Sequence, residues 1–186
     1  MISLLRKSAA FLILIMASPL MLIVAIVIYL EDGFPIIFKQ VRSGLNGRHF
    51  NFYKFRTMKQ NVPNVATHLL NDPAIYLLKS GSFLRKTSID ELPNIYNVLR
   101  GDMNFVGPRP ALYNQDDLIS LRKEFGINSI KPGITGWAQI NGRDEINIKE
   151  KIELEKWYMA NNDTICDFII IVKTISKIIY RKNVAH

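Results

Sequence analysis

One long apolar stretch dominates the pattern of hydrophobic and polar positions along the chain. No charged residue occurs in the 23 positions from Ser8 to Leu30. An α-helix needs about 20 apolar residues to cross a bilayer, so this pattern predicts a membrane helix over residues 1–30. A cleaved signal peptide has a shorter apolar region, of about 7 to 15 residues, followed by an A-x-A-like site that this sequence lacks. The stretch is therefore predicted to remain part of the protein.

Ser18-Pro19 lies near the middle of this stretch, and basic residues flank both of its ends. Arg6 and Lys7 precede it, and five Lys or Arg residues follow between positions 39 and 56. A single crossing can keep only one basic end in the cytoplasm. Proline inside a helix carries a penalty of about 3 kcal/mol, so a break there could turn the helix back toward the same face. A kinked spanning helix is the alternative.

Two short β-rich runs follow, "PIIFKQVR" and "HFNFYKFRTM", joined by "SGLNGR". Asn46-Gly47 in the connection is a hairpin signal, so the runs predict a β-hairpin. By the period of two, Lys54 and Arg56 share one face of the second strand and could present two positive charges to a phosphate. A solvated strand face is the alternative.

Helical spacing returns around residue 92, ends at Gly101 and resumes over residues 145–161. Because Pro93 is tolerated only in the first helical turn, Asp90 and Glu91 are predicted at the opening of the first of these helices. Two rigid, Gly-rich segments, "GDMNFVGPRPALYNQ" and "KPGITGWAQINGRDE", read as loops that could cradle a ligand; they carry Arg109 and Arg143.

The last segment, "ICDFIIIVKTISKIIYRKN", predicts a basic amphipathic helix. Its basic side chains recur at i, i+4 and i+8. Its apolar stripe comprises Ile165, Phe168, Ile169, Val172, Ile175 and Ile179. Such helices can lie in a bilayer interface, which the membrane segment at the other terminus favours; packing of the stripe on the domain core is the alternative.

Composition bounds the class of protein. With 186 residues, 48% of them hydrophobic, the chain can form one ordinary domain. Lys and Arg number 24 against 16 Asp and Glu, a net charge of +8 that favours anionic partners. The single cysteine, Cys166, excludes an internal disulfide and a Cys-rich metal cluster, and its apolar surroundings predict a buried position. Zinc-type spacings, a Ser-His-Asp set, a Walker-type loop, a dinucleotide fingerprint and nucleic-acid-binding signatures are all missing, so no nucleic-acid partner is expected.

The acidic pair in "KTSIDELPN" admits two interpretations. Ser, Asp and Glu are suited to a helix N-terminus, where they satisfy backbone N–H groups and complement the dipole. Neighbouring helical residues point about 100° apart, so Asp90 and Glu91 could also take different chemical roles. A carboxylate can attack phosphorus, and Arg85, Lys86, Arg100 and Arg109 supply cations suited to a diphosphate. The residues alone leave both interpretations open.

Four motifs in order resemble one family across nearly the whole chain. They are the apolar segment with Ser18-Pro19, "IFKQVRSGLNGRHFNFYKFRTM", "LRKTSIDELPNIYNVLRGDMNFVGPRP" and "KPGITGWAQINGRD". The chain resembles the bacterial sugar transferases, the small monotopic phosphoglycosyl transferases that begin capsule, O-antigen and glycoprotein glycan assembly. It looks most like the short enzymes of capsular polysaccharide synthesis. Asn94 stands where many relatives have Gln, and the C-terminal tail is short.

The resemblance implies an α+β fold. Residues 1–30 would form a re-entrant membrane helix broken at Ser18 and Pro19. Residues 31–186 would form a mainly helical catalytic domain on the cytoplasmic face of the bacterial inner membrane, with a small β-hairpin and interfacial amphipathic helices.

The resemblance also implies a reaction. Asp90 would attack the β-phosphate of a UDP-sugar, release UMP and carry a phosphosugar to undecaprenyl phosphate. Glu91 would assist with Mg²⁺, which is expected at Asp90 and Glu91. Arg85, Arg109, Lys54 and Arg143 are expected near the substrate phosphates.

Several points stay open at the sequence level. The sugar is expected to be an N-acetylated 6-deoxyhexosamine such as FucNAc, with diacetamido sugars or galactose as alternatives, and the oligomeric state is open. One competing function is a conventional glycosyltransferase, which would release UDP. Another is a non-catalytic membrane-anchored module that binds anions.

Overall fold

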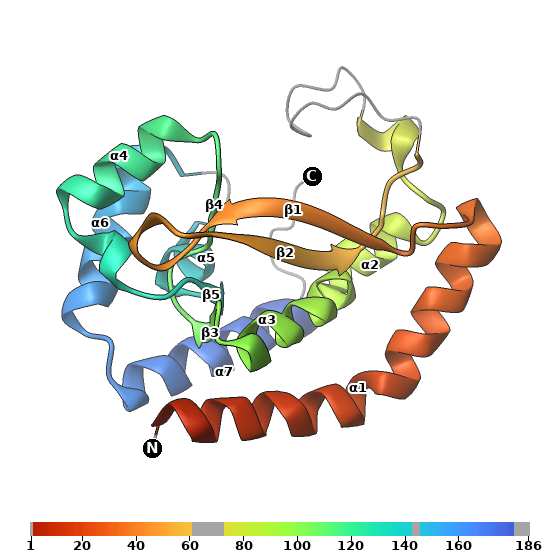
Figure 1. Cartoon of the computed structure of the whole chain (residues 1–186), viewed down its shortest axis with the longest axis horizontal. Helices are drawn as coiled ribbons and strands as arrows, with labels where there is room; N and C mark the ends of the chain where they lie inside the picture. Colours follow the sequence, from red (N-terminus) through yellow and green to blue (C-terminus); the bar gives the residue numbers. More distant parts are fainter. Residues whose placement is uncertain (1, 61–72, 143–145, 181–186) are drawn as a thin grey trace.

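The computed structural model describes residues 2–60, 73–142 and 146–180 (Figure 1). It is an α+β fold in which a long N-terminal helix runs beside a small domain built on a hairpin. The elements in chain order are α1 (Ile2–Asp32), β1 (Ile37–Ser43), η1 (Leu45–Gly47), β2 (His49–Phe55), η3 (Pro73–Tyr76), α2 (Gly81–Thr87), η4 (Ile89–Asn94), α3 (Ile95–Arg100), β3 (Asn104–Val106), β4 (Ala111–Leu112), α4 (Asp116–Glu124), η5 (Ile127–Ser129), β5 (Gly133–Thr135), α5 (Trp137–Asn141), α6 (Ile148–Ala160) and α7 (Thr164–Tyr180).

The predicted apolar helix is present as α1, and its segment Leu4–Asp32 is long and apolar enough to cross a membrane, with a mean hydropathy of 3.0 over its most apolar 18 residues. Pro19 lies inside it, and Figure 1 shows that the helix bends along its length. The Ser18 hydroxyl donates to the Ile15 carbonyl oxygen at 2.8 Å, one turn back. The backbone stays helical through Ser18 and Pro19, so the predicted break takes the form of a bend within one helix.

Two short stretches of α1 hold it against the domain. Ala10 is fully buried against Phe52 of β2 and against Ile95 and Val98 at and near the start of α3. Val24 and Ile28 are buried in a second cluster with Phe55 of β2 and with Leu78 and Leu84. Most of the other large side chains of α1 are exposed, which is typical of a helix whose solvent is lipid.

The predicted hairpin is confirmed. β1 and β2 pair antiparallel from Ile37 with Phe55 to Ser43 with His49, and β4 adds to the other edge of β1. Asn46 and Gly47 in the connection have φ angles of 52° and 76°. Asn and Gly are the residues that adopt such angles at least cost, which explains why this dipeptide closes the hairpin.

A second, parallel sheet of β3 and β5 sits beside the hairpin and positions the "GPRP" turn. The strands approach closely here: a Cβ on Gly107 would lie 2.4 Å from the carbonyl oxygen of Lys131. Glycine is therefore required at position 107, and the turn leaves β3 in a fixed direction toward Arg109.

Helix α7 shows which face of the amphipathic segment meets the domain. Cys166 and Ile170 are buried beside Tyr158 of α6, so the predicted burial of the cysteine is confirmed. The predicted apolar stripe is on the opposite side. Exposure is 43–71% for its members Ile165, Phe168, Ile169, Val172 and Ile175. Packing of this stripe on the domain core is therefore wrong, and a contiguous apolar surface of this kind typically marks an interaction site.

Candidate active site

The acidic pair lies on η4, a 3-10 segment that begins directly after Ser88. Ser88 has a φ of 56°, and its carbonyl oxygen accepts from the Glu91 N–H at 3.1 Å, which closes the turn. The expected helix opens later than predicted, because α3 begins only at Ile95. Neither Ser88 nor Asn94 makes a side-chain capping bond. The structure thus gives no support to helix capping as the reason for the pair.

Strand β2 anchors η4 and the helix that follows it. The Asn94 side-chain oxygen accepts from the backbone N–H of Tyr53 at 3.3 Å, and the Asn97 amide donates to the Asn51 carbonyl at 2.7 Å. Both asparagine side chains are fully buried. These contacts fix the register between β2 and η4, and so they set where Lys54, the next residue of β2, lies relative to the acidic pair.

Asp90 is a buried carboxylate, with a relative exposure of 6%. Burial and, to a smaller extent, the neighbouring Glu91 raise the pKa of Asp90 to about 6, against the opposing effect of Lys54, Arg85 and Arg109. Among the residues that the structure describes, the Asp90 side chain accepts no hydrogen bond. The surrounding cations stabilise the ionised Asp90 carboxylate. Because no donor among the described residues occupies its lone pairs, this carboxylate is suited to act as a nucleophile.

Lys54 on β2 opposes the rise in the Asp90 pKa more than either arginine does. Burial, with smaller contributions from Arg109 and Arg85, lowers the pKa of Lys54 to about 8, although Asp90 and Glu91 oppose this shift. Arg56, predicted to share a strand face with Lys54, is used differently. Its guanidinium is buried, pairs with Asp32 at the end of α1 and donates to the Gly33 carbonyl at 2.8 Å. Lys54 therefore faces the acidic pair while Arg56 ties the long helix to the hairpin.

Glu91 accepts hydrogen bonds directly from a cation. Arg109 donates from both Nη1 and Nη2 to Oε1 of Glu91, at 3.1 Å each. Arg85 approaches from α2, where its Nε donates to the Thr57 hydroxyl at 2.9 Å, and its pKa is lowered by burial and raised by Asp90. Lys54, Arg85 and Arg109, from three separate segments, thus converge on two adjacent carboxylates.

A buried ion pair holds the backbone of Arg109. Arg122 of α4 donates from Nε to Glu155 of α6 at 2.8 Å, and its Nη2 donates to the backbone carbonyl of Arg109 at 2.8 Å. Both side chains are almost completely buried. The pair fixes the backbone of the "GPRP" turn, so it is a positioning element for Arg109.

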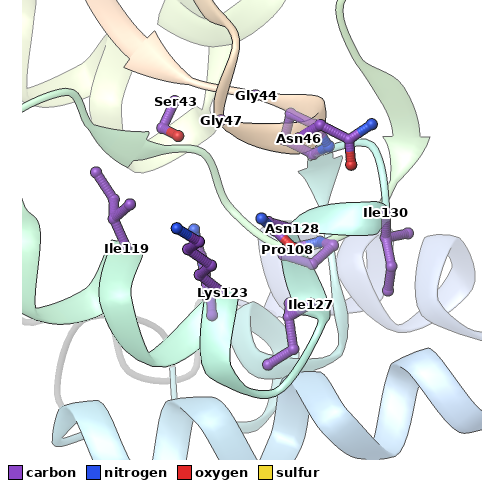
Figure 2. Close-up of a pocket in the computed structure, with 12 residues that line it drawn as sticks. Ser43, Gly44, Asn46, Gly47, Pro108, Ile119, Lys123, Ile127, Asn128 and Ile130 are labelled. Carbon is purple, nitrogen blue, oxygen red and sulfur yellow. The ribbon is translucent and has the colours of Figure 1, made fainter.

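A cavity of about 240 Å³ opens near the closed end of the hairpin, between η1, α4 and η5 (Figure 2). Lys123, Asn128 and Ser43 line it together with Pro108, and Figure 2 shows the Lys123 side chain extending toward the hairpin. Its lining includes neither acidic residue of η4. Through Pro108 and Arg122 it borders the far side of the turn that carries Arg109.

The model of the family described as bacterial sugar transferase matches residues 3–181 of this sequence. The chain belongs to that family. The residues that carried the resemblance are therefore in a sugar transferase, and the clustered carboxylates and cations are its candidate active site.

Individual relatives give the same result. The chain is 42% identical over 177 residues to the "uncharacterized sugar transferase EpsL" of Bacillus subtilis, covering 95% of this chain and 86% of the relative. It is 36% identical over 181 residues to the "exopolysaccharide production protein ExoY" of Sinorhizobium fredii, covering 89% and 80%. It is 44% identical over 149 residues to the "UDP-glucose:undecaprenyl-phosphate glucose-1-phosphate transferase" of Escherichia coli; this match covers 77% of the chain but only 32% of that longer protein.

The structure brings most of the expected site residues of this sugar transferase together. Asp90, Glu91, Arg85, Arg109 and Lys54 form one cluster by the contacts and electrostatic interactions given above. Arg143 lies outside the described residues. The described residues contain no group of three or more His, Cys, Asp or Glu side chains that could hold a metal ion by themselves.

Sequence reasoning missed the residues that support the site, namely Thr57, Arg122 and Glu155. For Arg122 and Glu155, the spacing from buried residues on their own helices could have indicated a buried position. Arg122 follows the buried Leu118 by four residues, and Glu155 follows the buried Ile152 by three. Opposite charges at core-facing positions of two helices are the mark of a buried ion pair.

Proposed function

We propose that this sugar transferase moves a sugar 1-phosphate from a UDP-sugar to undecaprenyl phosphate and releases UMP. The observation that carries the proposal is Asp90, a buried carboxylate without a hydrogen-bond donor among the described residues, surrounded by Lys54, Arg85 and Arg109. Relatives at 37–44% identity are named as glucose or galactose 1-phosphate transferases to undecaprenyl phosphate. The chain spans 32–39% of the length of those enzymes, and their reaction is proposed for it.

In the first step an oxygen of Asp90 attacks the β-phosphorus of the donor. The bond between this phosphorus and the bridging oxygen breaks, and UMP leaves with the bonding electrons. Lys54, Arg85 and Arg109 are placed to neutralise the negative charge of the diphosphate, which is the main requirement of phosphoryl transfer. The product is a phosphosugar esterified to Asp90.

In the second step a phosphate oxygen of the lipid attacks the same phosphorus. The bond to the Asp90 oxygen breaks, which regenerates the carboxylate and releases undecaprenyl-diphospho-sugar. Arg109 keeps Glu91 in place during both steps, because its Nη1 and Nη2 groups both donate to the same oxygen of Glu91. Glu91 therefore stays beside the reacting centre as a second negative group.

The donor set fits Mg²⁺. Two adjacent carboxylates are too few for an all-protein metal site, but Mg²⁺ is commonly held by one or two carboxylates together with substrate phosphates. Asp90 and Glu91 would hold the ion with the diphosphate. Bound there, it would supply charge neutralisation for the departing UMP.

The location of the reaction follows from its two substrates. UDP-sugar is soluble, whereas the lipid phosphate is held at a membrane surface. A long apolar α1 and the exposed apolar stripe of α7 on one small domain are suited to holding the site at that surface. We place the enzyme on the cytoplasmic face of the inner membrane, with α1 re-entrant and both of its ends on that face.

The sugar and the pathway are proposed from the resemblance. An N-acetylated 6-deoxyhexosamine such as FucNAc is the first donor to test, followed by diacetamido sugars and galactose. The product would begin a capsule or another surface glycan.

The test is release of UMP from a panel of UDP-sugars, with undecaprenyl phosphate and Mg²⁺, by the wild type and by Asp90→Asn. We expect UMP from at least one donor with the wild type and at least 1000-fold less with the variant, because the amide cannot act as an anionic nucleophile. Mass spectrometry of the peptide containing Asp90, after trapping with donor alone, should show the added phosphosugar. Release of UDP in place of UMP would support a conventional glycosyltransferase. Absence of turnover with every donor would support the non-catalytic module.

A further inference from the structure

Two lysines from distant parts of the chain meet at the end of α3. A Cβ on Gly101 would lie 3.8 Å from Nζ of Lys7 and 3.8 Å from Nζ of Lys131. Lys7 is on α1 and Lys131 precedes β5, so the fold brings two positive charges to one point. Gly101 has a φ of 90°, where glycine is favoured, and a side chain at this position would contact both lysines.

The other cations at this corner already have partners. Arg6 pairs with Asp167 at the start of α7, at 3.5 Å, and Arg100 pairs with Asp102 at 3.2 Å. Among the described residues, neither Lys7 nor Lys131 makes an ion pair or a side-chain hydrogen bond. The carbonyl groups at the end of α3 attract the ammonium groups through the helix dipole, but within the part of the chain that the structure describes neither lysine donates a hydrogen bond to them.

Both lysines are half-buried, so they are held more firmly than lysines on a free surface. Lys7 lies one turn before the fully buried Ala10, on the side of α1 that faces the domain. Two like charges held close together and partly desolvated repel each other, and an anion between them removes that repulsion. The pair is therefore complementary to a group such as a phosphate.

Exposed apolar side chains flank the pair on two elements. On α1, Leu4 and Leu5 are 70% and 65% exposed, and on α7, Ile165 and Phe168 are 71% and 65% exposed. The Arg6 to Asp167 contact places the start of α7 against the start of α1, and Figure 1 shows the two helices running close together there. Positive charge between two apolar surfaces matches a membrane interface, where phosphates lie just above the hydrocarbon.

We infer that Lys7 and Lys131 form a binding site for the headgroup phosphate of an anionic phospholipid, separate from the acceptor site at Asp90. This inference rests on the membrane association proposed above. The lipid would join α1 to the loop before β5, and so would hold the start of the long helix against the domain at the membrane surface.

The test uses the full chain purified in a mild detergent and titrated with phosphatidylglycerol, with retained lipid counted by native mass spectrometry. We expect the Lys7→Gln/Lys131→Gln variant to need at least 10-fold more phosphatidylglycerol than the wild type to retain its first lipid. Lys7→Arg/Lys131→Arg keeps both charges and should restore retention. It also shows that substitution at these positions does not itself unfold the protein.

The matched control removes two lysines elsewhere. Lys123→Gln/Lys149→Gln has the same net charge as the double variant and changes exposed residues on α4 and α6. We expect it to retain phosphatidylglycerol as the wild type does. If the control loses as much phosphatidylglycerol as the double variant does, retention depends only on the net charge of the protein. That result would overturn the proposed site.

Three further arms identify the ligand. Phosphatidylcholine, whose headgroup has no net charge, should be retained weakly by all variants, and inorganic phosphate should not displace bound phosphatidylglycerol. Displacement by inorganic phosphate, or a preference of the two lysines for undecaprenyl phosphate over phosphatidylglycerol, would overturn the assignment. UMP release by the same wild-type preparation separates the proposals. Turnover without lipid selectivity defeats the lipid site alone, and lipid selectivity without turnover defeats the proposed function alone.

Discussion

Arg109 binds Glu91 through two hydrogen bonds, from Nη1 and Nη2 to the single oxygen Oε1, at 3.1 Å each. The two adjacent carboxylates of η4 are therefore unequal. Glu91 is held by a cation, whereas Asp90 is buried beside charges without accepting a hydrogen bond among the described residues. This asymmetry supports the reactive role that we propose for Asp90 and the fixed role that we propose for Glu91.

The first prediction concerns Arg109→Lys. Lysine keeps the charge but cannot present two donors in a fixed plane. Hydrogen bonds to charged groups contribute about 1.5–3 kcal/mol, so we expect kcat/KM for UMP release to fall about 10- to 100-fold. Steady-state kinetics with a saturating lipid acceptor measures the effect. Arg48→Lys is the control, because Arg48 is an exposed residue of the connection between β1 and β2. An unchanged kcat/KM in Arg109→Lys would remove Arg109 from the site.

The second prediction is a bell-shaped pH profile. Asp90 must be ionised to attack, and burial and Glu91 hold its pKa at about 6, so activity should fall as the pH drops through about 6. Lys54 must be charged to bind phosphate, and burial holds its pKa at about 8, so activity should also fall as the pH rises through about 8. The profile of kcat/KM against pH measures both limbs.

Lys54→Arg and Lys54→Met separate the two groups. Arginine stays charged at all accessible pH values, so the alkaline limb near pH 8 should disappear while the acid limb stays. Methionine removes a cation that lowers the pKa of Asp90, so the acid limb should move to higher pH. An alkaline limb near pH 8 that persists in Lys54→Arg would show that another group titrates there.

The sequence predicted those features that depend on interactions between residues close together in the chain. The hairpin follows from Asn46-Gly47, because these residue types adopt at least cost the positive φ angles that its connection requires. The membrane helix follows from 23 uncharged positions in a row. The strand period placed Lys54 and Arg56 on one face, yet Arg56 is recruited by Asp32, a residue 24 positions away. Such a long-range pair depends on how the elements pack and has no local signature.

The third prediction concerns stability. Asp90 has its pKa raised from 3.8 to about 6 in the folded protein, so the folded state binds its proton more tightly than the unfolded state. The free energy of unfolding therefore falls as the pH rises from about 4 to 6 and stays lower above that range. Asp90→Asn removes the buried charge, and since one pKa unit corresponds to about 1.4 kcal/mol, we expect the variant to be about 1–3 kcal/mol more stable at pH 7.5.

Chemical denaturation in detergent at several pH values measures this. The gain should shrink toward pH 4, where Asp90 is protonated in the folded wild type, so the low-pH measurement serves as an internal control. A variant that is inactive and more stable is the expected result for a residue whose strain serves catalysis. A loss of stability in Asp90→Asn at pH 7.5 would mean that the carboxylate is held by favourable contacts.

The fourth prediction tests the ion pair behind Arg109. Removal of one partner leaves a buried charge uncompensated, so Glu155→Gln and Arg122→Met should each lower the free energy of unfolding by about 3–5 kcal/mol. Replacement of both, in Arg122→Met/Glu155→Leu, should recover most of that stability. It should not recover turnover, because the Nη2 bond to the Arg109 carbonyl is gone.

Tyr158→Phe provides a comparison on the same helix. The Tyr158 hydroxyl donates to Asp167 at 2.7 Å, so its removal weakens α6 on the side of α7 and leaves the Arg109 turn intact. We expect Tyr158→Phe to be less stable than the wild type but to keep a normal kcat/KM. We expect Arg122→Met/Glu155→Leu to have near-normal stability but a reduced kcat/KM. Thermal unfolding and UMP release on the same preparations provide both quantities. Full activity in the double variant would reduce Arg122 and Glu155 to a purely structural role.

The fifth prediction concerns the bend in α1. Pro19 cannot donate a backbone hydrogen bond, and the Ser18 hydroxyl bonds the Ile15 carbonyl one turn back, a combination that bends helices. If the bend returns the helix to the face it entered from, both ends lie on one side of the membrane. Ser18→Ala/Pro19→Ala removes both causes and should produce a straight helix of about 45 Å, at a rise of 1.5 Å per residue, which is more than enough to cross the bilayer.

Cysteine labelling decides between these arrangements. In a Cys166→Ser background, a cysteine placed at Ser3 or at Glu31 should react with a membrane-impermeant maleimide from the same side when Ser18 and Pro19 are present. In Ser18→Ala/Pro19→Ala the two positions should react from opposite sides, because the basic domain keeps Glu31 in the cytoplasm. Labelling from opposite sides in the parent protein would instead make α1 a spanning helix with a kink. The catalytic domain would then be held at the membrane by a single crossing.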